Sequence, residues 1–195
     1  TQYVYWFTSN GKVVRLPRGA SAGDTPQLVA NMAQIGFVYG WITVDNTQVY
    51  WSEGSILYRA PKDGSGSRSQ VFDYASTHGA STISQLTADG AGAVYLMYAN
   101  TVYRDRITLA EVAVSANGRG QSFTLGNNKV YWSEKDAVTS AVYLKSATML
   151  TPTTGLATLT TIAATGNPVV SNLAADSTNL YWHESRSNLG PIQRM

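Results

Sequence analysis

A short apolar phrase, in which Tyr is followed by a large apolar residue that is usually Trp, recurs along the chain. It begins at positions 4, 49, 94, 130 and 180, so successive copies lie 45, 45, 36 and 50 residues apart. Four of the five Trp residues occupy its third position. A period of about 40–45 residues is typical of folds that build one four-stranded sheet per repeat. The copies are Val4-Tyr5-Trp6, Val49-Tyr50-Trp51, Val94-Tyr95-Leu96, Val130-Tyr131-Trp132 and Leu180-Tyr181-Trp182.

Three further columns of apolar residues accompany this phrase and predict four β-strands per repeat. The preceding column reads apolar, small, apolar and then a turn residue, as in Ile42-Thr43-Val44-Asp45, and a short polar link joins it to the phrase. Two β-prone runs joined in this way predict a hairpin. A third run ends in a cation, as in Leu57-Tyr58-Arg59, and a looser fourth run follows, as in 70–72. No window of about 11 residues has a helical period, so the chain is predicted to be all-β.

The expected architecture is a β-propeller of four-stranded antiparallel blades with five repeats. One small twisted sheet cannot cover its own apolar faces, so neighbouring sheets stack, and the Tyr and Trp of the phrase are expected to fill the layers between them. We expect one domain over residues 1–195. The first visible unit begins at its second strand and the last ends at its third, which fits either a five-bladed ring or a fragment of a six-bladed ring. The approximate units are 1–35, 36–83, 84–120, 121–169 and 170–195.

Two copies of the extended phrase, Val49-Tyr50-Trp51-Ser52-Glu53 and Leu180-Tyr181-Trp182-His183-Glu184, resemble the YWTD repeat. That family includes the propellers of low-density-lipoprotein-receptor ectodomains and of bacterial secreted proteins, and it is typically six-bladed. The stretch 180–195 is also similar to the second strand, loop and third strand of the family. The Thr-Asp pair of the family is replaced by Ser52-Glu53 and by Ser133-Glu134. The resemblance implies a propeller fold and says little about a ligand.

Composition narrows the functional classes. Charged residues make up 13% of the chain, the formal net charge is +2, and no basic stripe is present, which argues against nucleic acid as a partner. The absence of Cys excludes disulfides, thiolate chemistry and Cys-ligated zinc. No apolar run approaches the roughly 18 residues of a membrane-spanning helix. The polar remainder, rich in Ser, Thr, Asn, Gln and Gly, favours a secreted or cell-surface protein, and the resemblance favours a bacterial one.

The first candidate binding residues are those that enter the innermost strand of each blade, because propellers bind ligands where loops surround the central channel. These positions include neither a carboxylate nor a histidine, whereas a hard cation such as Ca²⁺ needs several oxygen ligands. We therefore expect no metal, no cofactor and no catalytic residue there. A neutral ring of aromatic and amide side chains suits a sugar or a peptide, unless these residues simply plug the channel. They are Trp41, Gln85, Ser122 and Asn172.

A second candidate set lies in the loops. The links between second and third strands contain four of the twelve acidic residues and could form a polar rim for a cationic partner. Alternatively, Glu53, Glu134 and Glu184 form exposed pairs with cations of the following strand, such as Arg59, Lys145 and Arg194. Two Gly-rich stretches, 64–67 and 117–120, are predicted to be turns. The loop candidates are His78, Glu134, Asp136 and His183.

These observations favour a non-catalytic extracellular module that recognises a protein or a glycan on its loop face. One alternative is a propeller-type hydrolase or lyase, for which Glu53, Glu134 and Glu184 are the only carboxylates with suitable repetition. A Ser hydrolase of the nucleophile-elbow type is disfavoured because no Gly-x-Ser-x-Gly occurs. The other alternative is a structural segment of a large surface protein.

Overall fold

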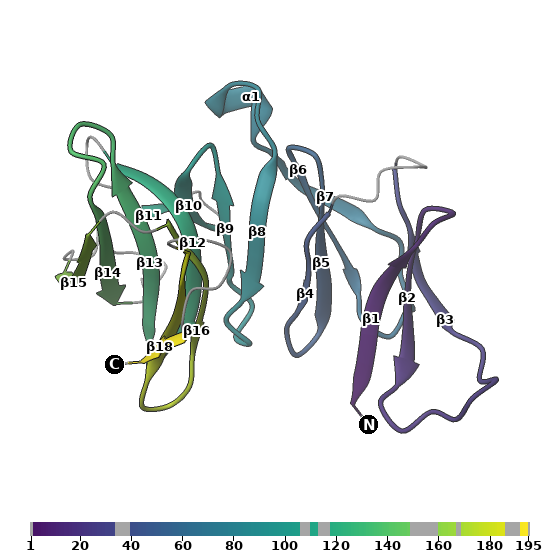
Figure 1. The fold of residues 1–195 in the computed structure, drawn as a ribbon. Coiled ribbons are helices and arrows are strands. Elements are labelled where there is room, and N and C mark those ends of the chain that lie inside the picture. The colour runs from purple at the N-terminus through teal and green to yellow at the C-terminus, as the bar shows by residue number, and fades with distance from the viewer. Residues whose placement is uncertain are drawn as a thin grey trace. The chain divides into compact units, whose positions relative to one another are not determined.

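The computed structural model describes residues 2–33, 40–105, 110–112, 118–148, 160–166, 169–185 and 192–194. Contacts within the chain divide it into two compact units, Thr1–Val94 and Tyr95–Met195, which are considered separately. The described residues form eighteen strands and one single-turn helix, α1 (Ala75–His78). The prediction of an all-β chain is therefore confirmed (Figure 1).

The strands form five small antiparallel sheets, and in each sheet they are ordered as they occur along the chain. The first unit contains two complete sheets and the first strand of a third, because the division between units falls inside β9. The first sheet is β1 (Tyr3–Thr8), β2 (Lys12–Pro17) and β3 (Gln27–Asn31). The second is β4 (Ile42–Val44), β5 (Gln48–Glu53), β6 (Ile56–Pro61) and β7 (Ser69–Asp73).

The remaining sheets follow the same order. The third is β8 (Ile83–Ala88), β9 (Val94–Tyr98), β10 (Thr101–Asp105) and β11 (Ala110–Val112). The fourth is β12 (Gly118–Gly126), β13 (Lys129–Asp136), β14 (Val142–Thr148) and β15 (Thr160–Gly166). The fifth is β16 (Val169–Ala175), β17 (Leu180–Ser185) and β18 (Ile192–Arg194).

The four columns read from the sequence correspond to the strands of these sheets. The repeated phrase lies in β1, β5, β9, β13 and β17, and the apolar-small-apolar column lies in β4, β8, β12 and β16. The prediction of a turn at 64–67 is confirmed between β6 and β7. The prediction of a turn at 117–120 is wrong for its described part. Gly118 and Gly120 lie in β12 and pair with Asp136 and Glu134 of β13. Extension of β13 past Glu134 gives these glycines a partner strand.

Stacked sheets form the core of the first unit. Phe7 and Val13 of the first sheet pack with Val49 and Trp51 of the second, and the indole of Trp51 stacks on Tyr58 with ring centroids 5.8 Å apart. Trp51 is fully buried. The first strands of the second and third sheets, β4 and β8, lie side by side in this unit (Figure 1), and the amide of Ala88 donates to Thr43 Oγ1 at 3.0 Å.

The second unit repeats this arrangement. Val142 and Leu144 of the fourth sheet pack with Leu173, Leu180 and Trp182 of the fifth. The first strands of the fourth and fifth sheets, β12 and β16, are neighbours. A Cβ at Gly126 would lie 2.7 Å from the Cβ of Ala175, so only Gly permits this approach. The expectation that the Trp residues of the phrase are core residues is confirmed for Trp51, Trp132 and Trp182, whereas Trp6 is half-buried.

In two sheets the hairpin between the first and second strands is fixed by the same type of contact between an Asp and a Tyr. In the link between β4 and β5, Asp45 Oδ1 accepts from the amides of Thr47 and Gln48, both at 2.6 Å, and Oδ2 accepts from the Tyr50 hydroxyl at 2.9 Å. Asp176 makes the equivalent contacts before β17, including 2.8 Å to the Tyr181 hydroxyl. Burial alone would raise the pKa of Asp45, but these donors lower it overall.

Candidate binding site

Trp41 is the one predicted inner-strand candidate with a large apolar side chain. It lies immediately before β4, and 47% of its surface is accessible. Its backbone is fixed by two bonds to β5: the Trp41 amide donates to Ser52 Oγ, and the Ser52 amide donates to the Trp41 carbonyl, both at 3.0 Å. A Cβ at Gly40 would overlap the Ser52 carbonyl and touch the Phe7 ring, so this approach requires Gly. An exposed indole therefore stands on a rigid strand end.

The other inner-strand candidates do not stand at strand entries, and that expectation is wrong for them. Gln85 lies inside β8, and Ser122 and Asn172 lie inside β12 and β16, because these strands begin earlier than the apolar column. Ser122 is buried, and its Oγ accepts from the amide of Leu173 at 3.3 Å. Asn172 is exposed at φ 56°, within an irregularity of β16 between Ser171 and Ala174.

The repeated glutamates are buried structural residues in the two repeats where they are described. Glu53 is the last residue of β5, and its Oε1 accepts from the Trp51 indole at 2.8 Å. Both of its oxygens also accept from the Ala33 amide. The expected pairing with Arg59 is wrong, because Arg59 is exposed on β6 and donates to Ser69 Oγ. The Glu53 carboxylate thus joins its own strand to the segment that follows β3.

Glu134 repeats the indole contact and adds an ion pair. The Trp132 indole donates to Glu134 Oε2 at 3.1 Å, and Lys145 Nζ lies 2.8 Å from Glu134 Oε1. The predicted pairing with Lys145 is confirmed, but the prediction of an exposed pair is wrong: the side chains are 2% and 11% accessible. Glu134 lies inside β13, opposite Tyr143 of β14, so the strand register brings the two charges together. The side chain of Glu184 lies outside the described residues.

The remaining loop candidates lie apart from one another along the chain. Asp136 begins the turn between β13 and β14, where its Oδ1 accepts from the amides of Val138 and Thr139. Bonds from the Thr139 amide and hydroxyl, together with the Val138 amide, lower the pKa of Asp136. His78 is exposed at the end of α1 and stacks on Tyr74, with ring centroids 6.0 Å apart. His183 is half-buried within β17.

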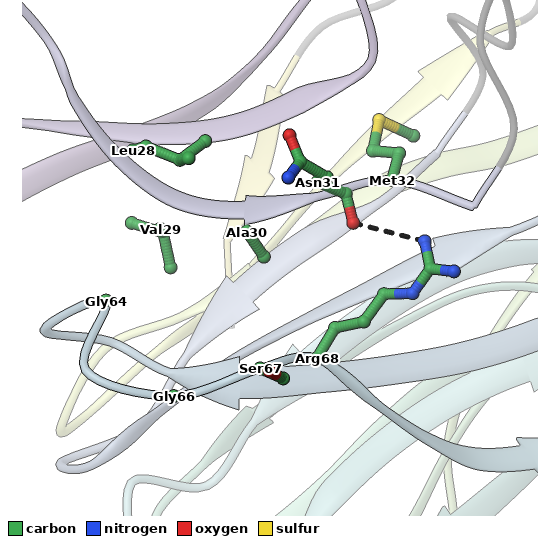
Figure 2. Close-up of a pocket in the computed structure, with 9 residues that line it drawn as sticks. All are labelled: Leu28, Val29, Ala30, Asn31, Met32, Gly64, Gly66, Ser67 and Arg68. Atoms are coloured by element: carbon green, nitrogen blue, oxygen red, sulfur yellow. Dashed lines mark hydrogen bonds between the residues drawn. The ribbon is translucent and has the colours of Figure 1, made fainter.

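A hollow of about 370 Å³ between the first two sheets was not predicted from the sequence. Its walls are β3 with the residue that follows it and the loop from β6 to β7 (Figure 2). Arg68 crosses it: Nη1 donates to the Asn31 carbonyl at 3.1 Å, and the guanidinium lies 5.2 Å from the centre of the Tyr58 ring. Much of the wall is backbone and small side chains, for which sequence patterns give no signal.

Nowhere in the described part of the chain do three His, Asp or Glu side chains gather in a way that could hold a metal ion. None of its helices has the length and apolarity needed to cross a bilayer.

Comparison with known proteins shows the fold. No family model matches the chain, the YWTD models included, and no curated protein matches its sequence. The extracellular domain of the two component system BT4673 from B. thetaiotaomicron matches 99% of this chain over 26% of its own length, with 15% identity and a TM-score of 0.62. The computationally designed Ika8 protein matches 99% of the chain over 55% of its own length, with 12% identity and a TM-score of 0.63.

A structure from a study of two prolyl endopeptidases matches 98% of the chain over 33% of its own length, with 10% identity and a TM-score of 0.60. The chain therefore spans between 26% and 55% of these three structures. At such low identity the likeness is informative about fold alone. The chain is an all-β protein of several small antiparallel sheets, similar in fold to propeller-like proteins.

Proposed function

We propose that this chain is a non-catalytic extracellular binding module that recognises a protein or a glycan through the exposed end of its inner strands. In this proposal its sheets belong to one β-propeller domain, either a five-bladed ring or part of a six-bladed ring, with kinship to the YWTD propellers. The module is secreted or displayed at a cell surface, in keeping with the low charge of the chain.

The observation on which the proposal rests is the Trp41 indole, 47% accessible on a backbone that is bonded twice to Ser52. Aromatic side chains provide a large contact area with little loss of conformational entropy, and they stack on sugar rings and peptide groups. The strand end is fixed before a ligand arrives, so little ordering is needed on binding.

The burial of the repeated carboxylates favours binding over hydrolysis. Glu53 and Glu134 both accept from a Trp indole, and Glu134 is also paired with Lys145. A catalytic acid or base must reach the substrate directly or through one water molecule. Carboxylates that are 6% and 2% accessible and already hydrogen-bonded do not meet this requirement.

Glycan-array and surface-display peptide screens of the whole chain test this proposal. We expect a ligand whose binding weakens at least about tenfold in Trp41→Ala, the loss expected for a central aromatic contact. Val138→Ala is the matched control, because Val138 is 78% accessible in the turn after β13. Undiminished binding by Trp41→Ala, or equal loss in both variants, would remove Trp41 from the site.

A further inference from the structure

Arg68 places a positive charge at the hollow between β3 and the loop from β6 to β7. The hollow has a volume of about 370 Å³, within the range of about 300–1,000 Å³ that is typical of sites for small ligands. Among the described residues no carboxylate forms an ion pair with Arg68. Two carboxylates of the second sheet have other partners, because Glu53 accepts from an indole and Asp73 from a Ser hydroxyl. The charge at the wall of the hollow therefore has no counter-ion in this part of the chain.

The Arg68 guanidinium is held in place by two contacts that leave some of its donors free. Nη1 donates to the Asn31 carbonyl at 3.1 Å (Figure 2), and the group lies 5.2 Å from the centre of the Tyr58 ring. A guanidinium has five N–H donors in a planar fork. Nε and Nη2 have no hydrogen-bond partner among the described residues. These two donors are parallel, and together they match the two oxygens of one carboxylate.

The backbone of Asn31 adds a donor to the same wall. Asn31 is opposite Lys12, and the next residue, Met32, donates its amide to the Gly11 carbonyl at 2.8 Å. Hydrogen-bonded pairs alternate along an antiparallel ladder, so the amide and the carbonyl of Asn31 both point away from β2. The bond from Arg68 to this carbonyl agrees with that direction. The Asn31 amide has no partner in the described part of the chain and is free to bind an anion.

The opposite wall is a turn whose backbone approaches β3 closely. Gly64 has φ 76°, and a Cβ there would lie 2.7 Å from the carbonyl oxygen of Leu28. Gly64 and Gly66 both line the hollow, and neither has a side chain to fill it. A larger residue at position 64 would be strained at this φ and would push the turn away from β3. The form of the hollow therefore depends on glycine at this position.

The remaining lining of the hollow is partly apolar. Leu28 lines it and is 49% accessible, an unusual exposure for a leucine, and the buried Met32 lies at the same wall. Ser67 adds an exposed hydroxyl. An exposed apolar side chain near a cation that lacks a counter-ion suits a ligand that combines an acid group with an apolar face. The volume of the hollow suits a compact ligand of this kind.

We propose that this hollow binds a small molecule that has one carboxylate on a compact body of about the size of a monosaccharide. Nε and Nη2 of Arg68 bind the carboxylate, the Asn31 amide provides a further donor, and Leu28 contacts the body of the ligand. An acidic sugar and an acylated amino acid share this chemistry. Trp41 does not line the hollow, and the proposal does not depend on the function of that residue.

The probes are glucuronate and N-acetylleucine, each titrated into the whole ¹⁵N-labelled chain and followed by the NMR signals of the Asn31 amide and the Arg68 Nε–H. We expect saturable shifts of both signals with at least one acid, at a Kd of about 1 mM for a ligand this small. Glucose and N-acetylleucinamide have the same bodies without the carboxylate and should give no saturable shift. Neither acid saturating below about 20 mM, or neutral compounds binding as tightly as the acids, would overturn the proposal.

Two variants of Arg68 test the assigned contact through the Asn31 amide signal. Arg68→Gln removes the charge and the fork and should weaken binding of the acid at least about tenfold. Arg68→Lys keeps the charge without the paired donors and should restore only part of the affinity. Arg59→Gln is the matched control, because Arg59 is also exposed in the second sheet and does not line the hollow. Equal loss in Arg68→Gln and Arg59→Gln, or full binding by Arg68→Gln, would overturn the proposal.

Discussion

At the scale of single residues, side chains that look chemically available in the sequence are used to hold strands together. Sequence spacing predicted Lys145 as a partner for Glu134, but it gave no measure of burial, which depends on how β13 and β14 pack against other elements. The bond from Trp to the Glu two residues later was not predicted, although the recurrence of Trp-Ser-Glu was a visible signal. Side chains separated by two positions in a strand share a face, which permits this contact.

Removal of the Glu134 carboxylate should destabilise the chain strongly. Glu134→Ala leaves Lys145 buried without this counter-ion and the Trp132 indole without this acceptor, and breaking a buried pair in this way costs about 3–5 kcal/mol. Lys129→Ala, an exposed position in the same strand, should change stability by less than about 0.5 kcal/mol. Urea denaturation followed by Trp fluorescence measures both. A loss below about 1 kcal/mol for Glu134→Ala would argue that the pair is not buried in solution.

The Asp of the hairpin links gives an acid-sensitive contribution to stability. Bonds from the Thr178 and Asn179 amides and from the Tyr181 hydroxyl hold the pKa of Asp176 well below its usual range. Its contribution is complete above the unfolded pKa of about 3.9 and is lost as the pH falls towards the lower folded pKa, because the unfolded state takes up the proton first.

We therefore expect the urea midpoint of the wild type to fall between pH 6 and pH 3, and Asp176→Asn to show a smaller fall over that range. The same asparagine should be less stable than the wild type at pH 6, where the carboxylate is ionised in both states of the wild type. An identical pH dependence of the two proteins would mean that Asp176 does not make these bonds in solution.

At the scale of elements, the sequence predicted the strands well and the links less well. The apolar columns located the strands of all four types, whereas α1 and the early start of β12 were missed. A single turn such as α1 has no period to detect, and the glycines that begin β12 lack the side chains that indicate a strand. The link Asn127-Asn128 was expected to be a short connection, and both residues have positive φ, 49° and 56°.

Positive φ at both Asn127 and Asn128 is typical of the two-residue hairpin turn that favours the sequence Asn-Gly. Asn128→Gly should leave stability unchanged or raise it slightly. Asn128→Val places a β-branched residue at positive φ and should cost about 1–3 kcal/mol. Thermal unfolding of the three proteins measures the difference. A valine variant as stable as the wild type would contradict the left-handed conformation at position 128.

At the scale of the whole molecule, repetition was the strongest signal in the sequence. Spacing and composition predicted small antiparallel sheets that stack through Tyr and Trp, and packing of this kind is found within each compact unit. The number of blades and the closure of a ring depend on contacts between sheets far apart in the chain, for which a repeat period contains no information.

The central claim is that the repeated phrase forms a strand held from both sides by its sheet, as β5 is held by β4 and β6. Amide hydrogen exchange resolved by residue tests it most directly, because only hydrogen-bonded amides are protected. The account predicts slow exchange for the amide of Ser52, which is bonded to the Trp41 carbonyl. Exchange of the Ser52 amide as fast as that of an unfolded chain would contradict it.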